Sequence, residues 1–149
     1  MILLDTNVCI GILHANPKVL GHIHSASEAI GIPAMVEGEL YYGVDKSDFR
    51  EENLVATSKL LKSLVVYHTT DEIMRKFGEL KASLECRGRR IDDADIIIAA
   101  TALTLDATLA TGNTSHFTRF DGLKVENWFS STMPKAMLEN GRLGARFAL

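Results

Sequence analysis

The chain of 149 residues has the length of one domain, and 46% hydrophobic and 23% charged residues are typical of a globular protein rather than a disordered one. The net charge of −3 excludes a surface that coats nucleic acid as a whole, but leaves room for basic patches beside an acidic pocket. No apolar run approaches the roughly 18 residues of a membrane span, and no signal segment opens the chain. We therefore expect a cytoplasmic protein with no membrane partner, and two cysteines outside any CxxC pair fit that compartment.

The chain begins with a short apolar run, residues 1–4, that stops abruptly at Asp5, Thr6 and Asn7. An apolar run bounded by polar turn formers predicts a buried strand, and burial on both faces favours a parallel sheet between helices. In such sheets the ligand crevice lies beyond the carboxyl ends of the strands. Asp5 is therefore predicted to lie at that crevice.

The following segments alternate between helix and strand patterns, which predicts a three-layer α/β/α fold with a central, mainly parallel sheet. One domain is expected over 1–129, and 130–149 form a C-terminal extension of unassigned role with a net basic charge. A polar stretch separates two helices at 48–52. Helices are predicted over 8–13, 17–29, 34–44, 54–64, 71–86 and 92–105, and further strands over 31–33, 64–67, 107–111 and 123–125.

Four polar side chains are predicted at element ends that face one crevice: Asp5, Glu39, Asp95 and Asn113. Carboxylates that lie close together repel one another unless a cation neutralises them. Oxygen ligands without a supporting His or Cys select Mg²⁺ or Mn²⁺ rather than zinc. Such an ion can activate a water molecule and stabilise charge on a phosphate, which points to phosphoryl chemistry.

Each of these residues also has a purely structural interpretation, which the pattern leaves open. Asp5 could be a turn or cap residue, and Asn113 suits an ordinary turn. Glu39 could be a solvated helix carboxylate. Asp92 and Asp95 have nearly the spacing of a capping box, which would make Asp95 structural.

Several segments together resemble a known family. Leu3-Leu4-Asp5-Thr6-Asn7 resembles the opening motif of PIN domains, and Glu39-Leu40-Tyr41-Tyr42-Gly43 is similar to the E-L-x-x-G segment of their VapC toxin branch. The segment from Asp95 to Ala100 resembles the D-x-x-I-A-A helix of the family. Thr111-Gly112-Asn113, followed by His116-Phe117, resembles its T-x-[ND] turn. The resemblance runs in the right order from residue 2 to about residue 128.

The resemblance implies a Mg²⁺-dependent endoribonuclease, with Mn²⁺ as a possible substitute, that is the toxin of a type II toxin–antitoxin pair. RNA is the implied substrate, with tRNA expected. Asp5, Glu39 and Asp95 would be the metal-binding acidic residues, and Asn113 would take the fourth catalytic position, where many members have aspartate. The implied partners are a VapB-type antitoxin, which inserts a peptide into the active-site groove, and a second copy of the chain in a homodimer.

Further candidates lie beside these positions. Thr6, Asn7 and Thr111 belong to the motifs themselves. Asp93 is a candidate for the charge that Asn113 lacks, although a first-turn residue two positions from Asp95 should point elsewhere.

A basic loop is predicted just before the Asp95 helix. Arg87, Arg89 and Arg90 are expected to contact RNA phosphates there, together with Lys46 after the 34–44 helix. Charge runs are also typical of a solvated surface, and both interpretations stay open. The five histidines have no spacing of metal ligands and are interpreted as surface or core residues.

Other functional classes fit the sequence less well. A haloacid-dehalogenase-type phosphatase needs a second carboxylate where Asn7 stands, and asparagine cannot serve as its acid or base. The chain also lacks the acidic pair and late lysine of a receiver domain. The remaining alternative is a catalytically impaired PIN fold that acts as an RNA- or protein-binding module, and Asn113 is the residue that supports it.

Overall fold

A computed structural model describes residues 1–130 of the chain. The extension predicted over 130–149 therefore lies almost entirely outside the described residues. In chain order the elements are β1 (Ile2–Leu4), α1 (Thr6–Leu13), α2 (Pro17–Ser25), β2 (Ile30–Pro33), α3 (Ala34–Asp45), α4 (Arg50–Ser63), β3 (Val65–Tyr67), α5 (Asp71–Cys86), α6 (Asp93–Thr104), β4 (Thr108–Thr111), α7 (Thr114–Phe117) and β5 (Lys124–Asn127).

The five strands of the described residues form one parallel sheet in the order β3-β2-β1-β4-β5. The first strand of the chain is thus the central one. Leu3 pairs with Gly31 of β2 on one side and with Leu109 of β4 on the other. Because all strands run the same way, the residues that follow β1, β2 and β4 meet at one edge of the sheet.

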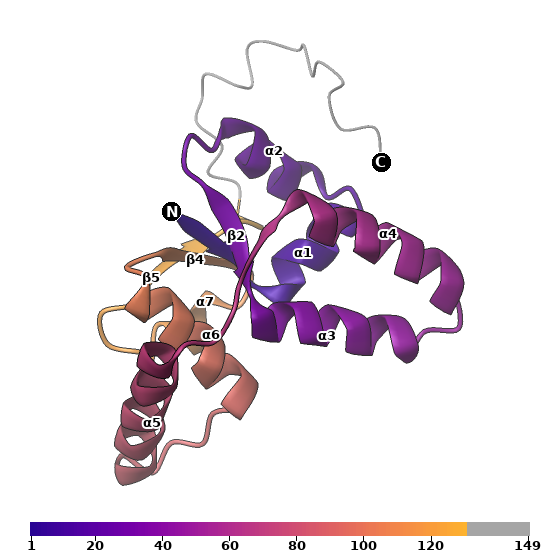
Figure 1. The fold of residues 1–149 in the computed structure, drawn as a ribbon. Helices are drawn as coiled ribbons and strands as arrows, with labels where there is room; N and C mark the ends of the chain where they lie inside the picture. Colours follow the sequence, from indigo (N-terminus) through magenta and orange to yellow (C-terminus); the bar gives the residue numbers. More distant parts are fainter. Residues whose placement is uncertain (131–149) are drawn as a thin grey trace.

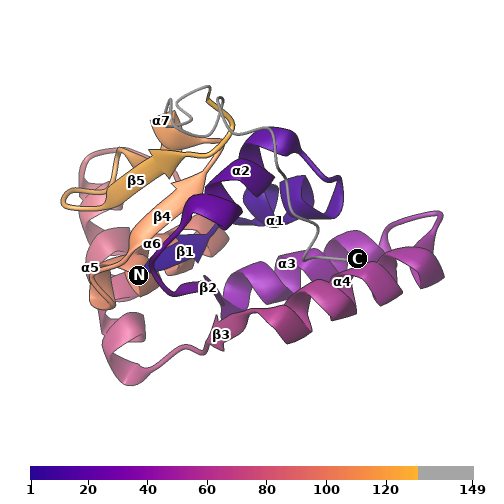
Figure 2. The same ribbon diagram turned by 90° about the horizontal axis from the view of Figure 1, so that it is seen from above.

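Helices cover the sheet on both sides, which confirms the predicted three-layer α/β/α fold. In Figure 1, α2 lies above the sheet and α5 and α6 lie below it, while α3 and α4 extend together to the right. Figure 2 shows the same pair projecting beyond β2 and β3.

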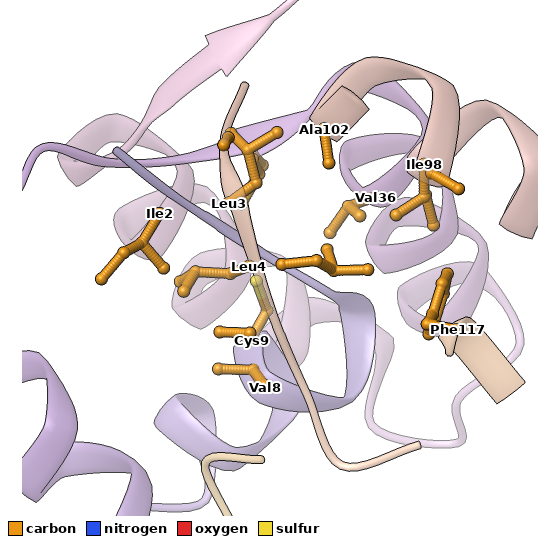
Figure 3. Packing of buried hydrophobic residues seen from close by; sticks show 14 of the residues in the cluster. Ile2, Leu3, Leu4, Val8, Cys9, Val36, Ile98, Ala102 and Phe117 are labelled. Carbon is orange, nitrogen blue, oxygen red and sulfur yellow. The ribbon is translucent and has the colours of Figure 1, made fainter. Parts of the chain in front are cut away.

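The core forms around β1, whose three residues are all buried. Figure 3 shows Leu3 and Leu4 among side chains from the surrounding helices, including Val36 of α3 and Ile98 of α6. All four of these side chains are fully buried. Full burial of such a side chain stabilises the fold by about 1.5–3 kcal/mol, so the strand that carries Asp5 is firmly anchored.

The predicted elements are present, with differences at their ends. Helix α2 ends at Ser25 rather than near residue 29. Helix α4 begins at Arg50, inside the stretch expected to be irregular, because Glu51 and Glu52 suit a helical first turn. The short helix α7 was not predicted, since four residues are too few to show a helical period. No helix within residues 1–130 is both long enough and apolar enough to cross a bilayer.

Candidate active site

Asp5 is fixed at the carboxyl end of the central strand. Its backbone N–H donates to the carbonyl of Ala110, 2.9 Å away in β4, and its side chain caps α1 by accepting from the Thr6 N–H at 2.8 Å. The other carboxylate oxygen, Oδ2, accepts from Asn7 Nδ2 and from Thr111 Oγ1, both at 2.6 Å. Only 5% of Asp5 is exposed. The carboxylate is therefore held in one orientation by donors from two neighbouring strand ends.

The same network shapes the turn that follows β4. Asn7 Oδ1 accepts from the Gly112 N–H at 2.8 Å, and Thr111 Oγ1 accepts from the Asn113 N–H at 2.9 Å. Asn113 precedes α7 and makes no side-chain cap bond to that helix. Asn7 and Thr111 thus join the ends of β1 and β4, and Asn113 is exposed just beyond the end of β4.

Glu39 approaches from α3, the helix that follows β2. Its Oε2 accepts a short hydrogen bond from Thr6 Oγ1, and the residue is partly buried. Thr6 therefore connects the beginning of α1, next to Asp5, to the Glu39 carboxylate of α3.

Asp95 lies in the first turn of α6. Asp92 is the N-cap of this helix but makes no side-chain cap bond, so the capping-box interpretation of Asp95 is not supported. Instead, Asp95 Oδ2 lies 2.8 Å from His116 Nε2 of α7. The two atoms are in contact without an aligned hydrogen bond, since His116 Nε2 has no such partner among the described residues.

The electrostatics show that the three carboxylates share one region. Burial raises the pKa of Asp5, and the charge of Asp95 raises it further, while the bonds from Thr111 and Thr6 oppose the change. Burial likewise raises the pKa of Glu39, and the charges of Asp5 and Asp95 add to that effect against the Thr6 bond. Carboxylates that disfavour one another's ionisation in this way are neutralised most directly by a bound cation.

The donor set fits a hydrated divalent ion. It consists of carboxylate oxygens, which are hard ligands of the kind that Mg²⁺ and Mn²⁺ accept. Within residues 1–130, no three acidic, histidine or cysteine side chains converge closely enough to enclose an ion by themselves. Mg²⁺ usually keeps several waters and takes only one or two carboxylates directly, so it does not need a fully enclosed site.

Two predicted site residues take part in ion pairs instead. Asp93 accepts from Lys81 Nζ with both oxygens at 2.8 Å, so it faces α5, away from Asp95. The charge that Asn113 lacks is therefore not supplied by Asp93. Arg87 pairs with Asp121 at 3.0 Å, which commits one guanidinium of the basic loop to a protein carboxylate.

The other predicted RNA contacts are exposed. Arg89 and Arg90 line a hollow beside the beginning of α6. The ammonium of Lys46 lies 5.8 Å from the ring centroid of Tyr42, at the far end of α3.

Sequence reasoning missed His116. His116 has no metal-ligand spacing to another histidine in the sequence. Its contact with Asp95 joins two separate helices, so no local spacing reveals it. The available signal was its position three residues after Asn113, in the segment that follows β4.

Fold and site together define a class: a parallel α/β protein whose acidic side chains gather at the carboxyl edge of the sheet. Residues 2–123 match the PIN domain. Ribonuclease VapC2 of Rickettsia felis is 33% identical over 129 residues, which cover 85% of this chain and 96% of that protein. The tRNA(fMet)-specific endonuclease VapC of Shigella flexneri is 28% identical over 127 residues, with the same coverage of 85% and 96%.

Solved structures agree with this relation. The chain resembles one in the crystal structure of VapBC2 from Rickettsia felis bound to a DNA fragment from their promoter, with a TM-score of 0.80 and 32% identity. The similarity covers 86% of this chain and 99% of that one. The chain therefore belongs to the PIN domain family and, within it, to the VapC type.

Proposed function

We propose that the protein is an endoribonuclease that hydrolyses phosphodiester bonds of RNA with Mg²⁺, for which Mn²⁺ can substitute, and that it is the toxin of a type II toxin–antitoxin pair. The observation that carries the proposal is the joining of Asp5 and Glu39 through Thr6 at the carboxyl edge of the sheet, with Asp95 near enough for its charge to raise the pKa of both carboxyl groups. Relatives over most of the chain bear the names of ribonucleases, which supports the choice of RNA.

Each residue has a defined part in this proposal. Asp5, Glu39 and Asp95 hold the ion, and Asn113 offers a neutral oxygen at the fourth position. Thr6, Asn7 and Thr111 fix these groups through the hydrogen bonds already described. The bound ion would supply an activated water and stabilise charge on the phosphate.

The proposed substrate is tRNA, acted on in the cytoplasm. The name of the Shigella relative supports this substrate class. The basic loop gives the protein cations near the acidic crevice, and phosphate contacts of this kind position RNA without reading its sequence.

The proposed partner is a VapB-type antitoxin. A second hollow of about 310 Å³ lies between α1, α3 and α4, with Ile10, Leu13, Leu40 and Val44 in its wall and Glu39 at its edge. A peptide that packs in this hollow would reach the acidic site, and the VapBC structures support a partner of this kind. We also propose a homodimer, in which the exposed Tyr41 and Tyr42 are candidate interface residues.

The second candidate is a binding module with an impaired site, which the neutral Asn113 favours. One experiment separates the two: the purified protein, free of antitoxin, is incubated with total tRNA in Mg²⁺ or EDTA. We expect cleavage only with Mg²⁺, its loss in Asp5→Asn, and its retention in Asp48→Asn, which removes an exposed carboxylate elsewhere. Cleavage that is absent, or that survives both EDTA and Asp5→Asn, would contradict the proposed function.

A further inference from the structure

A hollow of about 510 Å³ lies where α5 ends and α6 begins. The two helices lie side by side in Figure 1, and the loop that joins them forms one wall of the hollow. Leu84 and Ile96 are buried beneath it, and Ile91 is partly exposed. Its volume is within the range of small-molecule sites, about 300–1,000 Å³, and exceeds what a single phosphate group would fill.

The cations around this hollow differ in whether they are already neutralised. Lys81 is paired with Asp93, and Arg87 is paired with Asp121. By contrast, Arg89 and Arg90 are exposed and have no carboxylate partner within residues 1–130. Glu85 also lines the hollow but lies on the α5 side, where it contributes to the field at Lys81. Two guanidinium groups at the loop end are therefore available to an external anion.

The hollow is close to the acidic crevice but separate from it. Asp93 lines the hollow, whereas Asp95 belongs to the acidic site. Side chains two positions apart on an α-helix point in directions about 200° apart. The two places thus flank the first turn of α6 at a separation of about one helix diameter, ~10 Å. An RNA strand bound at the crevice would bring a neighbouring nucleotide to the hollow.

We propose that this hollow binds one unpaired nucleotide of the RNA beside the bond that is cut. The aliphatic side chains of Ile91 and its buried neighbours contact the base, and Arg89 and Arg90 bind its phosphate. Arg87 instead holds the loop in place through Asp121. This inference rests on the proposed function for its ligand, but it concerns binding and not cleavage.

The test measures binding of a fluorescent single-stranded RNA by anisotropy in EDTA, so that no cleavage occurs. We expect the double variant Arg89→Ala/Arg90→Ala to bind about tenfold more weakly, with a salt dependence reduced by about 0.7 in log–log slope for the one phosphate that is no longer neutralised. The matched control, Arg75→Ala, removes an exposed and paired cation of α5 and should bind within about twofold of the unsubstituted protein. Thermal melting checks that all variants fold.

The base contact is tested with RNAs that each lack one base. We expect one position at which the missing base weakens binding several-fold, and we expect this loss to disappear in Ile91→Ser. Equal binding by the double variant and Arg75→Ala would overturn the site, as would the absence of any base-dependent position. If binding behaves as expected but no RNA is cleaved in Mg²⁺, the proposed function fails and the nucleotide site stands. If RNA is cleaved in Mg²⁺ but the double variant binds as tightly as the unsubstituted protein, the proposed function stands and the nucleotide site fails.

Discussion

Replacement of Thr111 by valine tests whether the hydroxyl that joins two strand ends also holds the acidic site. Thr111 is fully buried, and its Oγ1 donates to Asp5 and accepts from the Asn113 N–H. Thr111 Oγ1 also accepts from Asn7 Nδ2 at 3.2 Å. Valine keeps the shape of the side chain and removes all three bonds. A hydrogen bond to a charged group contributes about 1.5–3 kcal/mol, and each of the two bonds from neutral donors adds about 0.5–1 kcal/mol. We therefore expect the free energy of unfolding to fall by about 2.5–5 kcal/mol at pH 7.

The effect should depend on pH in a defined direction. The Thr111 bond lowers the pKa of Asp5, although burial raises that pKa by more. The contribution of the bond is thus present when Asp5 is ionised and is lost as the pH falls through the pKa of Asp5 in the folded protein. The difference between Thr111→Val and the unsubstituted protein should shrink between neutral and acidic pH.

Urea unfolding followed by circular dichroism at several pH values gives both quantities. Thr111→Ser is the matched control, because it keeps the hydroxyl and removes one methyl group, at a cost of about 1 kcal/mol. If the valine variant is no less stable than the serine variant, or if the difference is the same at every pH, the hydroxyl does not hold Asp5 as described.

Three further predictions follow from the site and its surroundings. Glu39→Gln should raise the melting temperature of the metal-free protein at neutral pH. Because folding raises the pKa of Glu39, the ionised side chain destabilises the folded state. The gain in melting temperature should vanish as the pH falls below 4.5, the pKa of Glu39 in the unfolded chain. Gly112→Ala should lower stability in urea unfolding, since the added Cβ would lie 2.8 Å from the Phe129 ring, whereas Gly78→Ala in α5 meets nothing within 4 Å and should be neutral or stabilising by up to ~1 kcal/mol. Only one of the two cysteines should react with a thiol reagent in the folded protein, because burial raises the pKa of the Cys9 thiol to about 12; two fast-reacting thiols would contradict this.

Local patterns were sufficient for much of the fold. The apolar run before Asp5 predicts the buried strand, and the apolar stretch after Asp95 predicts a central helix, because burial on all sides leaves no polar face. The parallel sheet then follows from the alternation of strands and helices, and with it the common edge where Asp5 and Asn113 lie.

The partner of each charged side chain could not be predicted in the same way. Arg87 contacts Asp121, which lies 34 residues away, and Lys81 contacts Asp93 from a neighbouring helix. Such pairs depend on the packing of helices and loops, which sequence spacing does not encode. The same reason explains why the sequence does not reveal the contact between His116 and Asp95.

The central position of the first strand has a consequence for synthesis on the ribosome. Strand β1 emerges long before its second neighbour, β4, which is made only after residue 107. Asp5 lacks the Thr111 donor until then, and a sheet completed by such a distant pairing forms late. A nascent chain therefore cannot complete the acidic site until β4 has been made, so the site forms only after most of the sheet is in place.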